Sequence, residues 1–442
     1  MALDNVQGSC PGLVRCVGRW DVVALMINCI IGAAIFGLPS QIYALSGNYS
    51  LFAFGTCGLV VILVALCHAE VSSRFTETGG PYLYARKAFG SLIGFQIGWV
   101  AWLARLSSLA FVCNVLVSYL SFFWTPVGSG LWRVVLMVGV VVVLAAINII
   151  GVSTAAIASD ILSVAKLVPL LLFVSAGLVF IHSQNYYLTM PPALGSFSLA
   201  VSQLFVSFTG FELGLIAAGE VRDPQRNMPF GMLTALGLVV LVYILIQVVC
   251  IGTLPDLAAS EKPLADASSL FLGTGGASII TLGALISCTG TLNAILLAGS
   301  RLPFAMAEQN QLPRVLLSTH RRFHTPHASI LLTALIGLVL AVSGTFVYAL
   351  TLAAISKLLT SVATCAALPV LRRQTGNLPA VFQVPAGKAL SAAALGICVW
   401  LLANSGWREL RDVGIAVGIG SVLYFVYALK WRKLQPHGKG IR

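Results

Sequence analysis

Residues 26–39 read M-I-N-C-I-I-G-A-A-I-F-G-L-P, and residues 206–214 read V-S-F-T-G-F-E-L-G. Both stretches lie inside apolar runs of membrane-spanning length, and both carry small residues where an ordinary span would carry leucine. Small residues at mid-span either let two helices pack closely or let one helix unwind. The first ten apolar runs divide into two halves of five, and each stretch lies in the first run of its half. We therefore favour the interpretation that both helices are broken near mid-membrane.

The composition of the chain indicates that its solvent is lipid. Of the 442 residues 58% are hydrophobic and only 9% are charged, against roughly 25% charged in an ordinary soluble domain. In a bilayer each long apolar run must be helical, because no water satisfies the backbone. We therefore predict an all-α membrane protein of about twelve spans, at residues 20–46, 50–74, 90–124, 131–151, 157–182, 197–220, 229–254, 272–307, 328–344, 346–371, 388–404 and 410–430.

The distribution of basic residues predicts the orientation. With the amino terminus inside, most lysines and arginines fall in inner loops and tails, and the outer loops hold Arg133, Lys262, Arg408 and Arg411. This positive-inside bias predicts a multi-pass protein of the cell (inner) membrane with both termini cytoplasmic. The expected divisions are an inner tail at 1–19, a first repeat at 20–182, a second repeat at 197–371, two further spans at 388–430 and a basic inner tail at 431–442.

Other residue patterns exclude several classes of ligand. The ten cysteines are scattered, with no pair at metal-ligand spacing, so we expect no metal site and no cofactor. The net charge of +12 is divided among short loops, which does not favour a nucleic-acid partner.

Five stretches resemble one known family, the amino acid, polyamine and organocation permeases (the APC superfamily). They are I-I-G-A-A-I-F-G-L-P at 30–39, A-E-V-S-S-R-F-T-E-T-G-G-P-Y-L-Y-A-R-K-A-F-G at 69–90, F-T-G-F-E at 208–212 leading to G-E-V-R-D-P-Q-R-N-M-P at 219–229, R-L-P-F-A-M-A-E-Q-N-Q-L-P at 301–313 and L-P-V-L-R-R at 368–373. The resemblance implies the five-plus-five inverted-repeat fold of the bacterial leucine transporter. It also implies a secondary active amino acid transporter rather than an enzyme.

In such a fold the broken helices one and six form the substrate site. Half-helix amino ends attract a carboxylate, and loose carbonyls receive an ammonium, so a zwitterionic amino acid suits the pair. The expected carboxylate site lies around Gly32, Ala33 and Ala34, and the expected ammonium site lies at the carbonyls of Ser207, Phe208 and Thr209. The full set of expected substrate residues is Ile31, Gly32, Ala33, Ala34, Phe36, Arg105, Ser207, Phe208, Thr209, Gly210, Phe211, Glu212 and Ile295.

The chain departs from the family pattern in two places. The family usually has Gly-Ser-Gly or Gly-x-Gly at the first break, whereas here Gly32 is followed by Ala33 and Ala34, which leave room for a ligand but allow less conformational freedom. The arginine–agmatine antiporters of this family carry a tryptophan at two positions of the site, and the matching residues here look like Val206 and Ile295. Neither residue can stack on a guanidinium group, so an arginine-type substrate is not supported by these positions. With Phe36, Phe208, Phe211 and Ile295 expected to limit size, we predict a small or medium neutral amino acid. A cationic substrate, such as a polyamine or an arginine-type ligand carried by exchange, is the alternative.

Ionisable residues inside a membrane usually line a cavity or mark a proton path. Glu212 and Lys166 are the candidates for proton coupling, because Lys166 resembles the lysine that proton-coupled relatives place where sodium-coupled relatives hold an ion. Glu212 could instead be the structural partner of an arginine, and Lys166 could extend to the inner surface. Arg105 could pair with Glu212 or with the substrate carboxylate, and Lys357 is expected to be structural or part of a gate.

We therefore predict proton-coupled uptake or exchange of an amino acid by alternating access. The hydroxyls of Ser287 and Thr289 leave sodium coupling open as an alternative, because sodium-coupled relatives bind the ion with hydroxyls of the eighth helix. The expected partners are the amino acid, protons and the lipid bilayer, with a homo-oligomer left open. An intramembrane hydrolase is disfavoured, because few carboxylates lie within spans and the histidines fall mostly in loops or at helix ends. A channel or a non-transporting sensor would tolerate the same fold.

Overall fold

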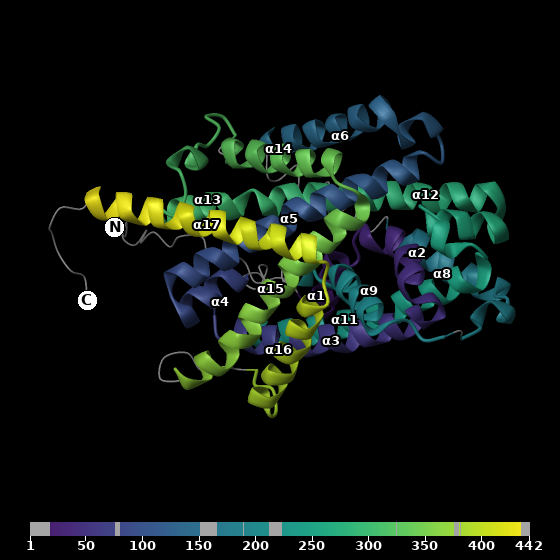
Figure 1. The fold of residues 1–442 in the computed structure, drawn as a ribbon, viewed down its shortest axis with the longest axis horizontal. Helices are drawn as coiled ribbons and strands as arrows, with labels where there is room; N and C mark the ends of the chain where they lie inside the picture. The colour runs from purple at the N-terminus through teal and green to yellow at the C-terminus, as the bar shows by residue number, and fades with distance from the viewer. Residues whose placement is uncertain are drawn as a thin grey trace, which may run out of the picture.

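The computed structural model describes residues 18–75, 80–150, 166–188, 190–211, 223–323, 325–374, 380 and 382–434. All regular elements within this part of the chain are helices (Figure 1). By length and composition, 7 of its helical stretches can cross a membrane, and four shorter apolar helices accompany them. The predicted all-α membrane fold is confirmed.

The helices occur at the predicted places. In chain order they are α1 Arg19–Ile30, α2 Ala34–Ser46, α3 Ser50–Ser72, α4 Gly80–Phe89, α5 Ser91–Leu120, α6 Gly130–Ile150, α8 Leu167–Gly177, α9 Leu194–Phe208, α11 Pro224–Thr253, α12 Pro263–Gly299, α13 Arg301–Glu308, α14 His327–Ser343, α15 Phe346–Arg373, α16 Gly387–Ala403 and α17 Trp407–Leu434. Every predicted span overlaps one or two of them. Their grouping into two inverted repeats stays a prediction.

Helix α4 occupies a segment that was predicted to lie between two spans. Leu83 and Tyr84 are buried on one face of α4, and Lys87 is exposed in its last turn. A helix with one apolar and one charged face lies along a surface rather than across a bilayer. Figure 1 shows α4 beside α5, at the same end of the molecule as α13.

Helix α12 begins at Pro263, before the predicted start at 272. The expected outer loop is shorter as a result, since Asp266 lies in the first turn of α12, where the helix dipole favours a carboxylate. The backbone of Gly273 leaves helical geometry, with φ 66° and ψ −167°. The predicted start of the span therefore falls next to a kink within a longer helix.

Polar side chains join the helices at several crossings in the core. Gln247 of α11 donates to Ser50 Oγ of α3 at 2.9 Å, and Gln203 of α9 donates to Thr351 Oγ1 of α15 at 3.1 Å. Such interhelical hydrogen bonds stabilise membrane helix packing, where apolar burial between helices is a weak driving force. Helix α5 packs against α12, α14 and α15, which places it at the centre of the bundle (Figure 1).

Candidate functional site

The first predicted break is present. Helix α1 ends at Ile30, Ile31 and Gly32 are not helical, and α2 begins at Ala34. Ile31 turns the chain with φ −71° and ψ 97°. The carbonyls at the end of α1 and the first N–H groups of α2 therefore lack partners within their own helices. These two ends carry partial negative and partial positive charge respectively.

The second predicted break lies at Thr209 and Gly210. Helix α9 ends at Phe208, and Phe211 is helical again. Gly210 has φ 139°, a conformation that is unfavourable for any residue with a side chain. A Cβ atom on Gly210 would lie 2.2 Å from the carbonyl oxygen of Cys29. The two broken helices thus touch through their backbones, and only glycine fits at this contact.

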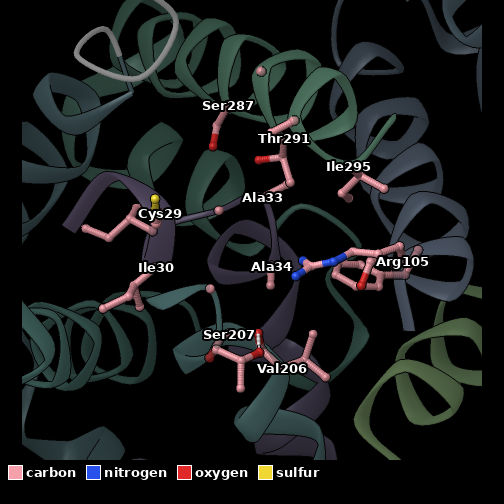
Figure 2. A pocket seen from close by; sticks show the side chains of 18 of the residues that line it. Cys29, Ile30, Ala33, Ala34, Arg105, Val206, Ser207, Ser287, Thr291 and Ile295 are labelled. Atoms are coloured by element: carbon pink, nitrogen blue, oxygen red, sulfur yellow. Dashed lines mark hydrogen bonds between the residues drawn. The ribbon is translucent and has the colours of Figure 1, made fainter. Parts of the chain in front are cut away.

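A cavity of about 140 Å³ lies between the breaks (Figure 2). Nine of the predicted substrate residues line it, namely Ile31, Gly32, Ala33, Ala34, Arg105, Ser207, Thr209, Gly210 and Ile295. A cavity of about 150 Å³ is large enough for a benzene-sized molecule. The space therefore suits a small organic ligand. Glu212 lies outside the described residues.

The three predicted phenylalanines are buried behind the cavity wall rather than in it. Phe36 packs edge-on against Tyr119 with ring centroids 5.8 Å apart, and Phe208 packs against Tyr243 at 5.1 Å. Phe211 contacts His68 at 5.3 Å. The sequence placed these residues near the breaks, but the side chains turn toward neighbouring helices. The apolar wall of the cavity comes instead from residues such as Phe111, Val206 and Ile295.

One face of α12 supplies a wall that sequence reasoning identified only in part. Ser287, Thr291 and Ile295 all line the cavity, and Figure 2 shows them along one helix. Residues four apart lie on the same side of a helix. The prediction that Ile295 lines the site therefore implied that Thr291 and Ser287 line it as well. A Cβ atom on Gly32 would lie 3.7 Å from Thr291 Oγ1, which shows how closely this face approaches the first break.

Three basic side chains line the same cavity. They are Arg105 of α5, Lys166 just before α8 and Lys357 of α15. Lys166 is 6% exposed and Lys357 is 8% exposed. In Figure 2 the guanidinium group of Arg105 extends toward Ala34, at the amino end of α2. The sequence predicted a cavity position for Arg105 only. Lys166 was expected to act in proton coupling apart from the substrate site, and Lys357 was expected to be structural or part of a gate, yet both line the same cavity.

Two buried hydroxyl groups of the cavity wall lack a hydrogen-bond partner within the described structure. They belong to Ser108, one turn beyond Arg105 on α5, and to Ser287 of α12. Buried hydroxyls without partners are uncommon in folded proteins, because each costs free energy. A ligand in the cavity could satisfy both groups.

The cavity wall is more exposed at one end than at the other. On α12, Gly290, Thr291 and Ala294 are partly exposed, whereas Ser287 and Ile295 are buried. The exposed residues lie nearer to the end of α12 that leads into α13. Helix α5 shows the same trend, because Arg105 is partly exposed and lies nearer to α4 than the buried residues that follow it.

A hydrogen bond joins α2 and α5 past the cavity-lining residues of both helices. The hydroxyl of Tyr119 donates to the carbonyl oxygen of Phe36 at 2.7 Å, and both side chains are fully buried. A second, polar cavity of about 260 Å³ is lined by residues that include Gly37, Arg133 and Glu261.

A buried ion cluster joins α3, α15 and the segment before α16. The carboxylate of Glu70 accepts hydrogen bonds from Arg74 at 3.0 Å, from two nitrogens of Arg372 at 2.7 and 2.5 Å, and from the backbone N–H of Val384 at 2.9 Å. The Glu70 side chain is fully buried. Glu70 and Arg372 both lie in stretches that carry the family resemblance, but neither was predicted as a functional residue.

Comparison with known proteins identifies the family of the chain. The family described as "Amino acid permease" matches residues 17–429. A methylthioribose transporter of Bacillus subtilis is 29% identical to the chain, with 96% of each protein covered. A branched-chain amino acid permease of the same organism is 26% identical, with 96% of the chain and 95% of that permease covered. A serine/threonine exchanger of the same organism is also 26% identical, with 96% and 98% covered. The chain therefore belongs to the amino acid permease family of membrane transporters.

Proposed function

We propose that the protein is a proton-coupled transporter that takes up a small or medium neutral amino acid by alternating access. The cavity of about 140 Å³ between two broken helices carries this proposal. The proposed location is the cell membrane, with both termini cytoplasmic. Two relatives are named for the transport of neutral amino acids, as a branched-chain permease and as a serine/threonine exchanger.

The two breaks offer opposite charges to the two ends of an amino acid. In the proposed pose the carboxylate lies at the N–H groups around Ala33 and Ala34, near the guanidinium of Arg105. The ammonium lies at the carboxyl end of α9, near Ser207 and Thr209. Helix ends attract charges of these signs. The unpartnered hydroxyls of Ser108 and Ser287 would then bind the ligand directly or through water.

A cationic ligand fits less well than a neutral one. Arg105, Lys166 and Lys357 all line the cavity, and like charges repel strongly at short range in a low-dielectric site. This observation disfavours the alternative of a polyamine or an arginine-type ligand. Exchange of one neutral amino acid for another remains compatible with the site, as the serine/threonine exchanger illustrates.

Transport in proteoliposomes tests the proposed function. Purified protein is reconstituted, and uptake is measured for labelled neutral, acidic and basic amino acids, with methylthioribose as a further ligand because of the relative named for it. Saturable uptake of a neutral amino acid supports the proposal. Uptake of basic amino acids alone, or of methylthioribose alone, would contradict it.

Ala33→Leu is expected to abolish ligand binding without unfolding the protein. Ala33 is fully buried and lines the cavity, so a leucine side chain would occupy space meant for the ligand. Binding is measured as the rise in thermal stability that an amino acid produces. Ala146→Leu on the exposed face of α6 is the matched control, and it should retain binding. Unchanged affinity in Ala33→Leu would exclude this placement of the substrate.

Lys166 is proposed to couple transport to protons. Lys166 and Cys29, near the end of α1, both line the cavity. An ammonium group has three donors that can bind free carbonyls. Protonated Lys166 would therefore hold α1 in place, and loss of the proton would release it.

Lys166→Ala is expected to bind substrate but to lose accumulation driven by a pH gradient. Uptake is measured in proteoliposomes with an imposed pH gradient and with sodium replaced by choline. The wild-type protein should accumulate substrate under these conditions, because protons rather than sodium provide the coupling. Uptake that depends on sodium, or full accumulation in Lys166→Ala, would contradict the proposal.

A further inference from the structure

Lys357 lies at the carboxyl end of the first half of the second broken helix. Its Nζ atom donates to Thr209 Oγ1 at 2.6 Å and to the carbonyl oxygen of Val206 at 3.4 Å. Lys357 comes from the middle of α15, far from α9 in sequence. Its side chain is 8% exposed and lines the cavity together with both partners.

This end of α9 is where an ammonium group is attracted. The last carbonyls of a helix lack intrahelical partners, and the helix dipole makes this end negative. Val206 O also accepts from Thr209 Oγ1 at 2.9 Å, so the hydroxyl and the carbonyl form one small acceptor site. In the structure a cation of the protein itself already binds to that site.

We propose that Lys357 is a tethered competitor for the ammonium group of the substrate, and that it determines how strongly the site discriminates between ligands with and without an ammonium. This inference rests on the proposed function, which places the substrate ammonium at the same end of α9. A ligand ammonium must displace the lysine from Val206 and Thr209, or bind beside a like charge. A carboxylic acid without an amino group meets no such competition.

The lysine side chain suits this role chemically. Its ammonium group is a compact charge on a flexible four-carbon stem, so it can withdraw when another cation arrives. In the proposed pose the carboxylate binds at Ala34 and Arg105 rather than at Val206 and Thr209, where Lys357 binds. Removal of Lys357 should therefore change recognition of the ammonium while leaving recognition of the carboxylate.

Lys357→Met tests the inference, because methionine keeps an unbranched chain and removes the charge. Dissociation constants are measured by calorimetry on purified protein for two matched pairs, L-alanine with propionate and L-valine with 3-methylbutanoate. Within each pair the ligands differ only in the amino group. In Lys357→Met the amino acids are expected to bind at least tenfold more tightly than to the wild-type protein, and the two acids are expected to gain nothing.

Three further variants separate competition from a structural role. Lys357→Arg keeps a cation and should keep the wild-type ratio of the two dissociation constants. Lys388→Met removes an exposed lysine of α16, outside the cavity, and should also keep that ratio. Lys357→Gln retains a hydrogen-bond donor without the charge, so it should show the same shift as methionine even where Lys357→Met fails to fold.

The outcomes distinguish this inference from the proposed function. If wild-type protein binds the amino acids and neutral variants change both members of a pair equally, the competitor is excluded and amino acid binding stands. A fall in amino acid affinity on loss of the lysine charge would likewise exclude competition. If no form of the protein binds either amino acid, both the inference and the proposed function are overturned.

Discussion

Gly210→Ala is expected to abolish transport and to destabilise the protein by about 2–6 kcal/mol, through backbone strain and overpacking. Two independent features of Gly210 produce this effect. Its φ of 139° lies in a region that residues with side chains rarely adopt. An added Cβ atom would also lie 2.2 Å from the carbonyl oxygen of Cys29. That oxygen belongs to backbone rather than to a flexible side chain, so the broken helices must separate to accommodate the methyl group.

A matched substitution on a regular helix isolates the effect. Gly237 lies within α11, and a Cβ atom there would meet nothing within 4 Å. Gly237→Ala should therefore be neutral or slightly stabilising, by up to about 1 kcal/mol. Chemical denaturation in detergent and uptake in proteoliposomes are measured for both variants. Wild-type stability in Gly210→Ala would show that α1 and α9 are not in backbone contact.

Glu70→Gln is expected to be the second most damaging substitution, with a loss of about 3–5 kcal/mol of folding free energy. The carboxylate of Glu70 is fully buried and binds both Arg74 and Arg372. A neutral amide cannot compensate two guanidinium groups, and the arginines would lose their charged acceptor. Removal of one partner from a buried ion cluster leaves uncompensated charge, which costs more than the intact cluster contributes.

A double-mutant cycle measures the coupling within this cluster. Glu70→Gln, Arg372→Gln and the double variant are compared by chemical denaturation, and the double variant should be less damaged than the sum of the two. Arg411 and Asp412 form an ion pair at 2.9 Å with side chains that are 58% and 28% exposed. Arg411→Gln should therefore cost only about 0–1 kcal/mol. Additive effects at Glu70 and Arg372 would mean that the buried contact contributes no coupling.

Sequence reasoning located the helices because hydrophobic length is a strong signal in membrane proteins. It located both breaks because Gly32 and Gly210 stand where a continuous span favours larger residues. It did not find α4, whose apolar face is short, or the extension of α12 before Gly273. Both segments owe their helical form to local packing and to helix-end chemistry rather than to the length of an apolar run.

The sequence predicted which backbone segments line the cavity better than it predicted which side chains point into it. Residues at the breaks line the cavity because the chain itself bends there. Phe36 and Phe208 do not line it, since the direction of a side chain depends on the rotation of its helix against neighbours. The position of Lys357 at Thr209 depends on packing between α15 and α9, and a tertiary contact of this kind leaves no periodic trace in one sequence.

The uneven exposure of the cavity wall has a consequence for sidedness. The partly exposed residues on α5 and α12 lie toward α4 and α13, whereas the Tyr119–Phe36 hydrogen bond joins α2 and α5 past the other end of the cavity lining. The cavity lining is therefore more accessible on the α4 side than on the side of Tyr119 and Phe36. Cytoplasmic termini, as proposed, put α4 on the inner side of the membrane, so we propose that this conformation belongs to the half of the transport cycle in which the site faces the cell interior.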